Sequence, residues 1–440
     1  MERKQKTKRQ YPSDEIHVDR GNGDLLAQHT LGDATPETYN LFGGDMLSEL
    51  TRVTRAHLAP GPHLDGPNMR MGERVLLDID ALLRSDEAGG ENSVKLLEWS
   101  RHAIISASSH AVYGHNHPFL DPEIEAALWL WQGYIPSHFV GLDIFKSGYK
   151  QRQKVFDALI SYYKDSRRRL GGSEVAKDRW RVLRQAGLSE VEAAKQEVSL
   201  CIGMTGNTAP TFYWVVWELF SRPALLEEVR MELQEQVVRV DSADDGAFIL
   251  DVARLKSKCP LLLSVIEETQ RHHHIHATVR KVMKDTILDN KYLLREGNYL
   301  QIPGNIVHFQ PHLWGSSAQE FNPYRFLAPA NNDKPHEYAP HAPGSASAFL
   351  AWGAPPNLCP ARQFAATEVM IMVALLAVRA EIRPKVGGWE KEPEWNHSEL
   401  HSVLNPKLDV TVCVTKRPEW GGRWYLEMGE SKSRVSLTSG

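Results

Sequence analysis

Residues 349–365 read FLAWGAPPNLCPARQFA and carry the most chemical information in the chain. The first part is rich in Gly and Pro, which predicts a loop, and the pattern from about residue 360 predicts a helix. Cys359 therefore stands at the first turn of that helix, directly before Pro360, a residue that suits this position. Amide groups and the dipole at a helix start favour negative charge, so Cys359 is a candidate thiolate and metal ligand.

This segment resembles the cysteine-ligand loop of the cytochrome P450 family, whose pattern is an aromatic residue, Gly, a second Gly, a polar or basic residue, Cys and a small residue. Trp352, Gly353, Asn357, Cys359 and Arg362 occupy the matching positions. The resemblance implies that the sulfur of Cys359 is the axial ligand of the iron in haem b (iron protoporphyrin IX), and that the other four residues help to bind this cofactor. The alternative is a buried structural cysteine.

Two positions depart from the family's pattern. Pro355 stands where a glycine is usual, and Ala361 replaces the small glycine after the ligand. Both positions concern the close approach of backbone to haem. The form WGAxxNxC with a following Arg is most similar to the branch that contains sterol 7α-hydroxylase and prostacyclin synthase, and the CPARQFA continuation resembles fungal members.

Two further motifs stand upstream, in the order that the family has. Glu268 and Arg271 in ETQR resemble the family's ExxR pair, and at i and i+3 they share one helix face. FNPYRF at residues 321–326 resembles the motif whose arginine completes a Glu–Arg–Arg network. The resemblance implies that Arg325 joins Glu268 and Arg271 in a structural clamp beneath the haem, which supports the fold rather than catalysis.

Arg280, in ATVRKV, matches a family position that contacts a haem propionate. A surface arginine is the alternative reading. Arg52 and Arg55, in the first clear helix, are further candidates for the same contact, although the family's Trp-x-x-x-Arg pattern is missing there.

The segment GMTGNTAP at 203–210 interrupts a strongly apolar helical pattern that runs from about residue 190 to 220. Two glycines and a proline inside a helix cost several kcal/mol in propensity, which predicts a distortion that faces a ligand. In the family, an acid–alcohol pair in the corresponding helix relays protons to bound oxygen. Asn207 and Thr208 take these two catalytic positions, so proton delivery has to use water or Thr208, because an amide carries no titratable proton.

The whole chain reads as one large, mainly α domain with minor β structure, which is the cytochrome P450 fold without its N-terminal anchor and part of its β domain. The expected boundaries are a poorly ordered segment at 1–45, a haem domain at 46–427 and a tail at 428–440. Helices are expected at 46–57, 68–84, 93–112, 123–134, 146–170, 190–220, 222–238, 259–273 and 360–378, with β-prone runs at 277–283, 286–294, 298–302 and 408–414 and a loop at 310–348.

Composition limits the classes of function. The 440 residues carry a net charge of -4, so nucleic acid is not an expected partner, and the four cysteines form no CxxC pair. The tract around His272, His273, His274 and His276 is expected to interact with helix-end carbonyls rather than to bind an added metal. No stretch approaches the ~20 apolar residues of a membrane span. The chain is therefore expected to be intracellular and N-terminally shortened, whereas family members usually sit on the endoplasmic reticulum.

The resemblance implies a haem–thiolate monooxygenase that acts on a lipophilic small molecule, in fungal secondary metabolism of terpenoid or sterol-like compounds. Its partners would be molecular oxygen and a separate NADPH–cytochrome P450 reductase, because the chain has no flavin or nicotinamide motif. Two alternatives stay open. Asn207 suggests an isomerase or dehydratase that needs no external oxygen, and the apparently missing N-terminal region suggests a non-functional remnant.

Overall fold

The computed structural model describes residues 16–17, 45–84, 92–242, 244, 246–327, 347–354, 357–389, 391–399, 401–429 and 433–438. Helices dominate these residues, as the sequence predicts, and the fold class is confirmed as mainly α with small sheets. The helices are α3 (Asp45–Leu58), α4 (Pro62–Arg84), α5 (Leu96–Tyr113), α6 (Pro122–Phe139), α7 (Ser147–Lys164), α8 (Ser166–Gly171), α9 (Glu174–Gln185), α10 (Glu190–Gln196), α11 (Val198–Thr205), α12 (Thr208–Phe220), α13 (Pro223–Gln236), α14 (Val252–Lys258), α15 (Pro260–His273), α16 (Gly304–His308), α17 (Pro311–Trp314) and α18 (Arg362–Arg379).

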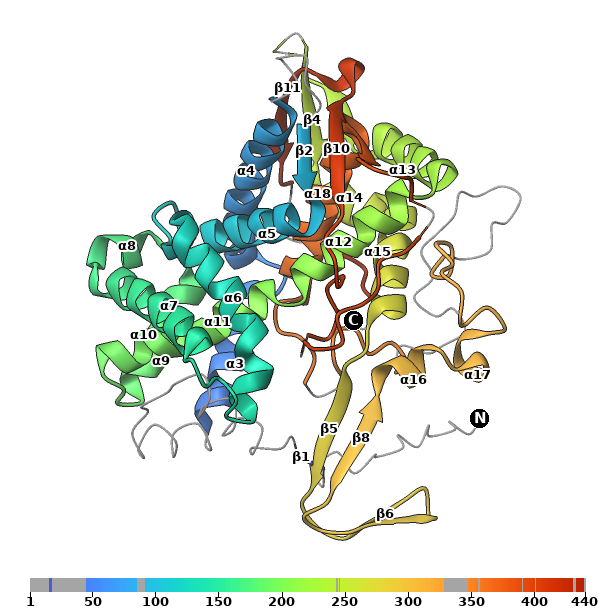
Figure 1. The fold of residues 1–440 in the computed structure, drawn as a ribbon. Coiled ribbons are helices and arrows are strands. Elements are labelled where there is room, and N and C mark those ends of the chain that lie inside the picture. Colours follow the sequence, from blue (N-terminus) through green and yellow to red (C-terminus); the bar gives the residue numbers. More distant parts are fainter. Residues whose placement is uncertain are drawn as a thin grey trace, which may run out of the picture.

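Three buried helices, α12, α15 and α18, form the centre of the fold (Figure 1). Nearly every side chain of α18 after its first residue is buried. A helix that is apolar on all sides has to be surrounded by other elements. Accordingly, α18 packs against α4, α12 and α13, while α12 packs against α5 and α15. Helices α6 to α10 gather on one side of this centre (Figure 1).

The strands form small sheets at the edges of the helical body. Strand β5 (Ala277–Val282) lies between β1 (Ile16–His17) and β8 (Tyr299–Pro303), and β6 (Thr286–Leu288) pairs with β7 (Tyr292–Leu294). Strand β10 (Thr411–Lys416) lies between β2 (Asn92–Lys95) and β9 (Ala380–Pro384). A third sheet orders β11 (Arg423–Glu427), β4 (Ala247–Asp251) and β3 (Val238–Val240).

The start of the expected helix at 93–112 is wrong, because Asn92–Lys95 form strand β2. Lys95 lies opposite Thr411 and Asn92 opposite Val414, so the partner strand comes from more than 300 residues away. Helix α5 then starts at Leu96, where the carboxylate of Asp409 accepts hydrogen bonds from the N–H groups of Leu97 and Glu98 at 2.8 and 3.0 Å. This long-range cap moves the helix start.

Two long expected helices are divided. The one at 146–170 breaks at Asp165, whose side chain accepts hydrogen bonds from the N–H groups of Arg167 and Arg168 and so starts α8 as a separate helix. The one at 190–220 becomes α10, α11 and α12. The expected loop at 310–348 contains α17, and its residues 328–346 lie outside the described part of the chain.

The described residues of the expected C-terminal tail pack into the fold. The N–H of Val435 donates to Oε1 of Gln363 in α18, and the carbonyl of Val435 accepts from Nε2 of the same side chain, both at 2.9 Å. The N–H of Thr438 donates to Oε1 of Glu267 in α15 at 2.8 Å. Residues 433–438 therefore join the start of α18 to the middle of α15. Apart from residues 16–17, the expected N-terminal segment 1–45 lies almost wholly outside the described residues.

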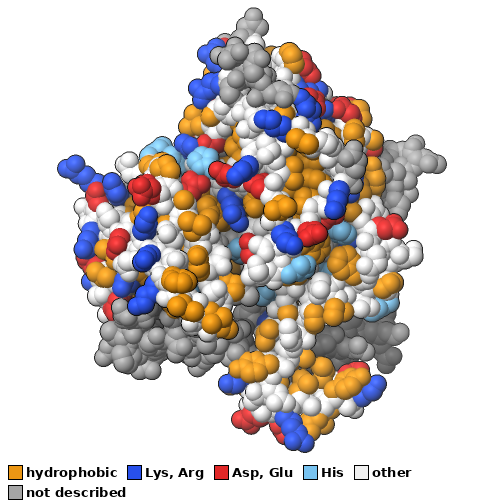
Figure 2. Space-filling model, viewed as in Figure 1, with side chains coloured by type: hydrophobic (Ala, Val, Ile, Leu, Met, Phe, Trp, Pro, Cys, Tyr) orange, Lys and Arg blue, Asp and Glu red, His pale blue; other side chains and the backbone are white. Residues whose placement is uncertain are grey.

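Acidic and basic side chains are interspersed on the face drawn in Figure 2, in keeping with the small net charge of -4. Among the described residues, no helix is both long enough and apolar enough to span a membrane.

Candidate functional site

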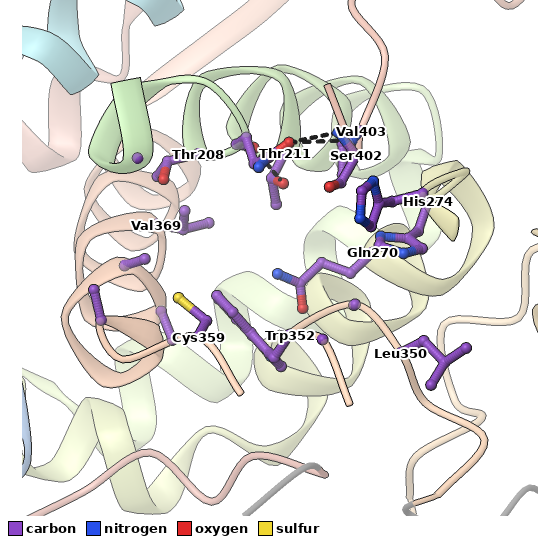
Figure 3. Close-up of a pocket in the computed structure, with 18 of the residues that line it drawn as sticks. Thr208, Thr211, Gln270, His274, Leu350, Trp352, Cys359, Val369, Ser402 and Val403 are labelled. Carbon is purple, nitrogen blue, oxygen red and sulfur yellow. Dashed lines mark hydrogen bonds between the residues drawn. The ribbon is translucent and has the colours of Figure 1, made fainter. Parts of the chain in front are cut away.

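Cys359 lies in the loop that leads into α18. The helix starts at Arg362 rather than at Pro360, so the cysteine stands just ahead of the first turn and not within it. Its N–H donates to the carbonyl of Trp352 at 2.8 Å, and its own carbonyl accepts from Nη1 of Arg362 at 3.3 Å. The sulfur points into a pocket (Figure 3).

Gly353 makes the tight course of this loop possible. Its φ of +85° is a conformation that L-residues with a side chain adopt rarely, and a Cβ at this position would stand 2.8 Å from the carbonyl oxygen of Asn357. The N–H of Asn357 in turn donates to the carbonyl of Ala354 at 2.9 Å. The loop therefore folds back on itself between Gly353 and Asn357, which brings Cys359 next to Trp352. Pro355, one of the two departures from the family pattern, lies outside the described residues.

The protonation of Cys359 depends on what fills the pocket. Burial raises the pKa of the thiol, whereas the N–H of Ala361 and the charge of Arg362 lower it. Because burial is the largest influence, the sulfur by itself favours its protonated form. A metal ion bound to the sulfur reverses this preference, since a coordinating thiol loses its proton.

The pocket lies between the central helices and the cysteine loop (Figure 3). Its cavity volume of about 270 Å³ lies near the lower end of the ~300–1,000 Å³ that typical small-molecule sites have. Most of its walls are apolar, with a few polar groups among them. The lining residues come from α11 and α12, from α15, from the cysteine loop and α18, and from residues 402–403; they include Met204, Thr208, Ile266, Gln270, Trp352 and Val369.

The wall opposite Cys359 is the break between α11 and α12. Three threonines at intervals of three residues donate their hydroxyl protons to carbonyls one turn back: Thr205 to Cys201, Thr208 to Met204 and Thr211 to Asn207, at 2.9, 2.7 and 2.8 Å. Such bonds compete with the helical ladder and bend helices. Together with Gly206 and Pro210 they account for the distortion that the sequence predicts, and the distortion faces the pocket.

Asn207 is engaged as an acceptor at this break. Its Oδ1 accepts hydrogen bonds from the N–H of Ser402 at 2.8 Å and from the N–H of Val403 at 3.4 Å (Figure 3). The side chain therefore fastens the segment 402–403 across the top of the pocket. Asn207 therefore has a structural role that could not be predicted from the sequence.

The three residues of the expected clamp meet in the interior. Glu268 accepts from Nε and Nη2 of Arg271 at 2.7 and 2.8 Å, and from Nε of Arg325 at 3.0–3.1 Å. The N–H of Asn322 donates to the same carboxylate at 2.8 Å. The two guanidinium groups also donate to several backbone carbonyls, including those of residues 308, 314, 317, 318 and 320. One carboxylate thus ties α15 to the segment before the cysteine loop.

Comparison with known proteins agrees with this arrangement. The family model described as Cytochrome P450 matches residues 137–413. The chain belongs to the cytochrome P450 family. It is 30% identical to the cytochrome P450 monooxygenase nodJ of Hypoxylon pulicicidum over 426 residues, which cover 94% of this chain and 80% of that protein. A cytochrome P450 monooxygenase of Gibberella zeae is 24% identical over 76% of this chain and 65% of its own length.

Shorter matches include sterol enzymes. The 5-beta-cholestane-3-alpha,7-alpha-diol 12-alpha-hydroxylase of Sus scrofa is 29% identical over 52% of this chain and 46% of its own length. These relatives identify this P450 as an oxidoreductase and support a monooxygenase role.

The site fits the family's haem–thiolate cofactor. Cys359 offers one sulfur to a mainly apolar pocket, and Gly353 allows the loop to pass close by. Trp352, Gly353, Asn357 and Cys359 all line the pocket and are the residues that would hold the group, with the sulfur of Cys359 as its ligand. Arg362 braces the ligand loop through the carbonyl of Cys359.

Arg280 lies beside the loop rather than in the pocket wall. Its Nη2 donates to the carbonyl of Ala354 at 3.3 Å, and its Nη1 donates to the carbonyl of Val279 at 2.9 Å. Burial lowers the pKa of its guanidinium, and no carboxylate of the described residues pairs with it. Arg52 is exposed and pairs with Glu49 at 2.5 Å, so it takes no part in the pocket.

Several pocket residues escaped the sequence analysis. Gln270 and His274 point into the pocket from α15 and its end (Figure 3). They follow Ile266 at intervals of four residues and so lie on one helix face, a relation that could have been predicted once the ETQR motif had placed a helix there. Ser402 and Val403 had no such signal, because only the tertiary fold brings them to the break in the α11–α12 region.

Proposed function

We propose that this P450 is a haem–thiolate monooxygenase that inserts oxygen into a lipophilic small molecule. The observation that carries the proposal is the sulfur of Cys359 in a mainly apolar pocket, opposite the hydroxyl of Thr208 (Figure 3). Haem b bound through this sulfur supplies oxygen activation, which the thiolate favours by donating electron density. The chain itself supplies the walls, the orientation of the substrate and the handling of protons.

Thr208 is the group placed to hold a proton near the reacting centre. Its hydroxyl donates to the carbonyl of Met204 at 2.7 Å, which leaves its oxygen lone pairs free to accept a hydrogen bond from water. Asn207 beside it has no titratable proton, and its Oδ1 is committed to Ser402 and Val403. Protons therefore reach the pocket through water that Thr208 orients, rather than through an acid.

The substrate class follows from the walls. Met204, Ile266, Leu350 and Val369 present apolar surface, and polar groups are few. Burying apolar surface of a ligand contributes roughly 25 cal/mol per Å². Together with the fungal and sterol-acting relatives, this favours a terpenoid or sterol-like skeleton in fungal secondary metabolism. Electrons come from a separate NADPH–cytochrome P450 reductase, at the endoplasmic reticulum where the family usually operates, and molecular oxygen is the co-substrate.

The test is the haem–thiolate bond itself. Cys359→Ser should abolish the thiolate-type band of the reduced carbon monoxide complex, and turnover with it, while Cys413→Ala in β10, outside the pocket walls, should keep both. An unchanged spectrum in Cys359→Ser overturns the proposal. Absence of the band in the parent protein would instead favour the alternative that the protein is a remnant that does not hold haem.

A second candidate function rests on Asn207. A haem–thiolate isomerase or dehydratase uses no external oxygen and needs no proton relay, so the amide would be no handicap. Turnover under ¹⁸O-labelled oxygen gas separates the two: label in the product supports the monooxygenase, and its absence with continued turnover supports the isomerase. Asn207→Asp keeps both acceptor bonds to residues 402–403 and adds an acid. For a monooxygenase we expect this variant to raise turnover, and for an isomerase to leave it unchanged or lower it.

A further inference from the structure

A carboxylate and two histidines meet in the interior, between α12 and α15, which pack side by side (Figure 1). One oxygen of Glu218 and one ring nitrogen each of His272 and His273 lie within 4.8 Å of one another. Glu218 and His273 are 2% and 1% exposed. These residues are separate from the pocket that Cys359 lines. We propose that this Glu–His–His cluster binds a divalent transition-metal ion, zinc in the first place.

His273 is held as a ligand is held in such sites. Its Nε2 is hydrogen-bonded to Oε1 of Glu218 at 2.9 Å, and a tetrahedral ion with ligands at 2.0–2.2 Å would replace this bond and hold the two atoms about 3.3–3.6 Å apart. Its Nδ1 has no hydrogen-bond partner, but Oε1 of Glu392 lies 4.0 Å away. A metal-bound histidine usually donates its second N–H to a carboxylate or carbonyl, which fixes the ring. Trp214, stacked on the ring with centroids 4.2 Å apart, holds its plane.

His272 offers a second imidazole nitrogen to the cluster. Its Nδ1 is buried without a hydrogen-bond partner, so this nitrogen is available as a ligand.

The neighbouring charges leave one carboxylate oxygen for the ion. Arg222 pairs with Oε2 of Glu218 and also donates to the backbone carbonyl of Glu218 at 2.8 Å, whereas Oε1 faces His273 and is the oxygen that an ion would bind in place of that hydrogen bond. An arginine on the distal oxygen orients the carboxylate in the way that outer partners of metal ligands do. Glu392 adds a second negative charge near the site. The two carboxylates together would offset the positive charges of Arg222 and of the bound ion.

The donor set selects the class of metal. Two imidazole nitrogens and one carboxylate oxygen suit zinc, copper or nickel, whereas calcium and magnesium prefer oxygen ligands alone. Three protein ligands leave a fourth position for water, as in open zinc sites. His272 is only partly buried, so that side of the cluster is the route by which the ion and its water enter.

An ion here would join the helix that covers the pocket to the helix that carries the clamp. Glu218 belongs to α12 and the histidines follow Arg271 directly in α15. The site would therefore stabilise the native arrangement of both helices, since a ligand that binds only the native state adds to stability.

The test uses the purified, untagged, haem-loaded protein and zinc ions alone. Equilibrium dialysis should give one zinc per chain, and X-ray absorption at the zinc edge should give a first shell of nitrogen and oxygen at about 2.0–2.1 Å with imidazole scattering. His272→Ala should weaken binding at least tenfold and should remove any zinc-dependent rise in melting temperature. His312→Ala, an exposed histidine of α17, should change neither.

Glu218→Gln is a second variant, and it should also weaken binding at least tenfold. Because Glu218 anchors Arg222 and His273, the fold of this variant has to be checked by circular dichroism. His272 contacts the rings of His273, Phe309 and Phe321, so His272→Ala is the safer change. Zinc affinity that is the same in the parent and in His272→Ala overturns the proposal, as does a shell without imidazole. Since the readout is zinc, the result does not depend on whether the protein is a monooxygenase.

Discussion

Glu368 in α18 should make the stability of this P450 fall as the pH rises. Its carboxyl is fully buried against α5, where the hydroxyl of Ser108 donates to both carboxyl oxygens at 2.8 and 3.0 Å. Burial raises the pKa of Glu368 from 4.5 to about 8, and the bond from Ser108 lowers it by less. At neutral pH the native protein therefore holds a proton there that the unfolded chain has released.

The sign and the size of the change in the free energy of unfolding follow from this difference in bound protons. Between about pH 4.5 and pH 8 the native state binds more protons at Glu368 than the unfolded state, so the free energy of unfolding decreases as the pH rises. At about 1.36 kcal/mol for each pKa unit, the full loss across that window is about 5 kcal/mol. An assay between pH 5.5 and pH 9 captures about 3 kcal/mol of it.

Glu368→Gln removes the titration and keeps the shape. The new amide group carries two N–H donors where the carboxyl group carries one proton, and a buried donor left unpaired costs about 1–3 kcal/mol at every pH. The parent should therefore be the more stable protein at pH 5.5, and the difference should shrink or reverse by pH 9. Denaturant midpoints of the haem-loaded proteins, followed by tryptophan fluorescence, give both curves, with Glu235→Gln on the exposed side of α13 as the control. Parallel curves for the parent and Glu368→Gln would refute the reasoning.

Three further changes test the supports of the site. Glu232 caps the start of α15 and burial raises its pKa to about 7, so stability should fall by about 3 kcal/mol between pH 4.5 and pH 7, and Glu232→Gln should flatten that part of the pH curve. Glu268→Gln leaves two buried guanidinium groups without a counter-charge; we expect a loss of about 3–5 kcal/mol in denaturant titrations and a lower haem content by absorbance. Gly353→Ala forces a side chain into a left-handed conformation and against the carbonyl of Asn357, so haem should dissociate faster, whereas Gly133→Ala, where an added Cβ meets no atom within 4 Å, should not change haem retention.

The sequence was sufficient wherever the chemistry is local. Cys359, its Gly-rich loop and the helix behind it are neighbours in the chain, and Glu268 and Arg271 share one helix face because three residues separate them. The interruption at 203–210 could be predicted for the same reason, since glycine, proline and threonine act on the backbone at their own positions.

The tertiary structure decided the contacts between distant segments. Asn207 fastens residues 402–403, Asp409 caps α5, and Glu218 meets His272 and His273, although 50 to more than 300 residues separate the partners. The type of a polar residue does not reveal which distant residue it will hydrogen-bond to in the fold. These pairs form only when apolar helices such as α18 pack together and bring their few polar side chains into contact. A buried polar group then has to form a hydrogen bond with a neighbour, because leaving it without one is costly.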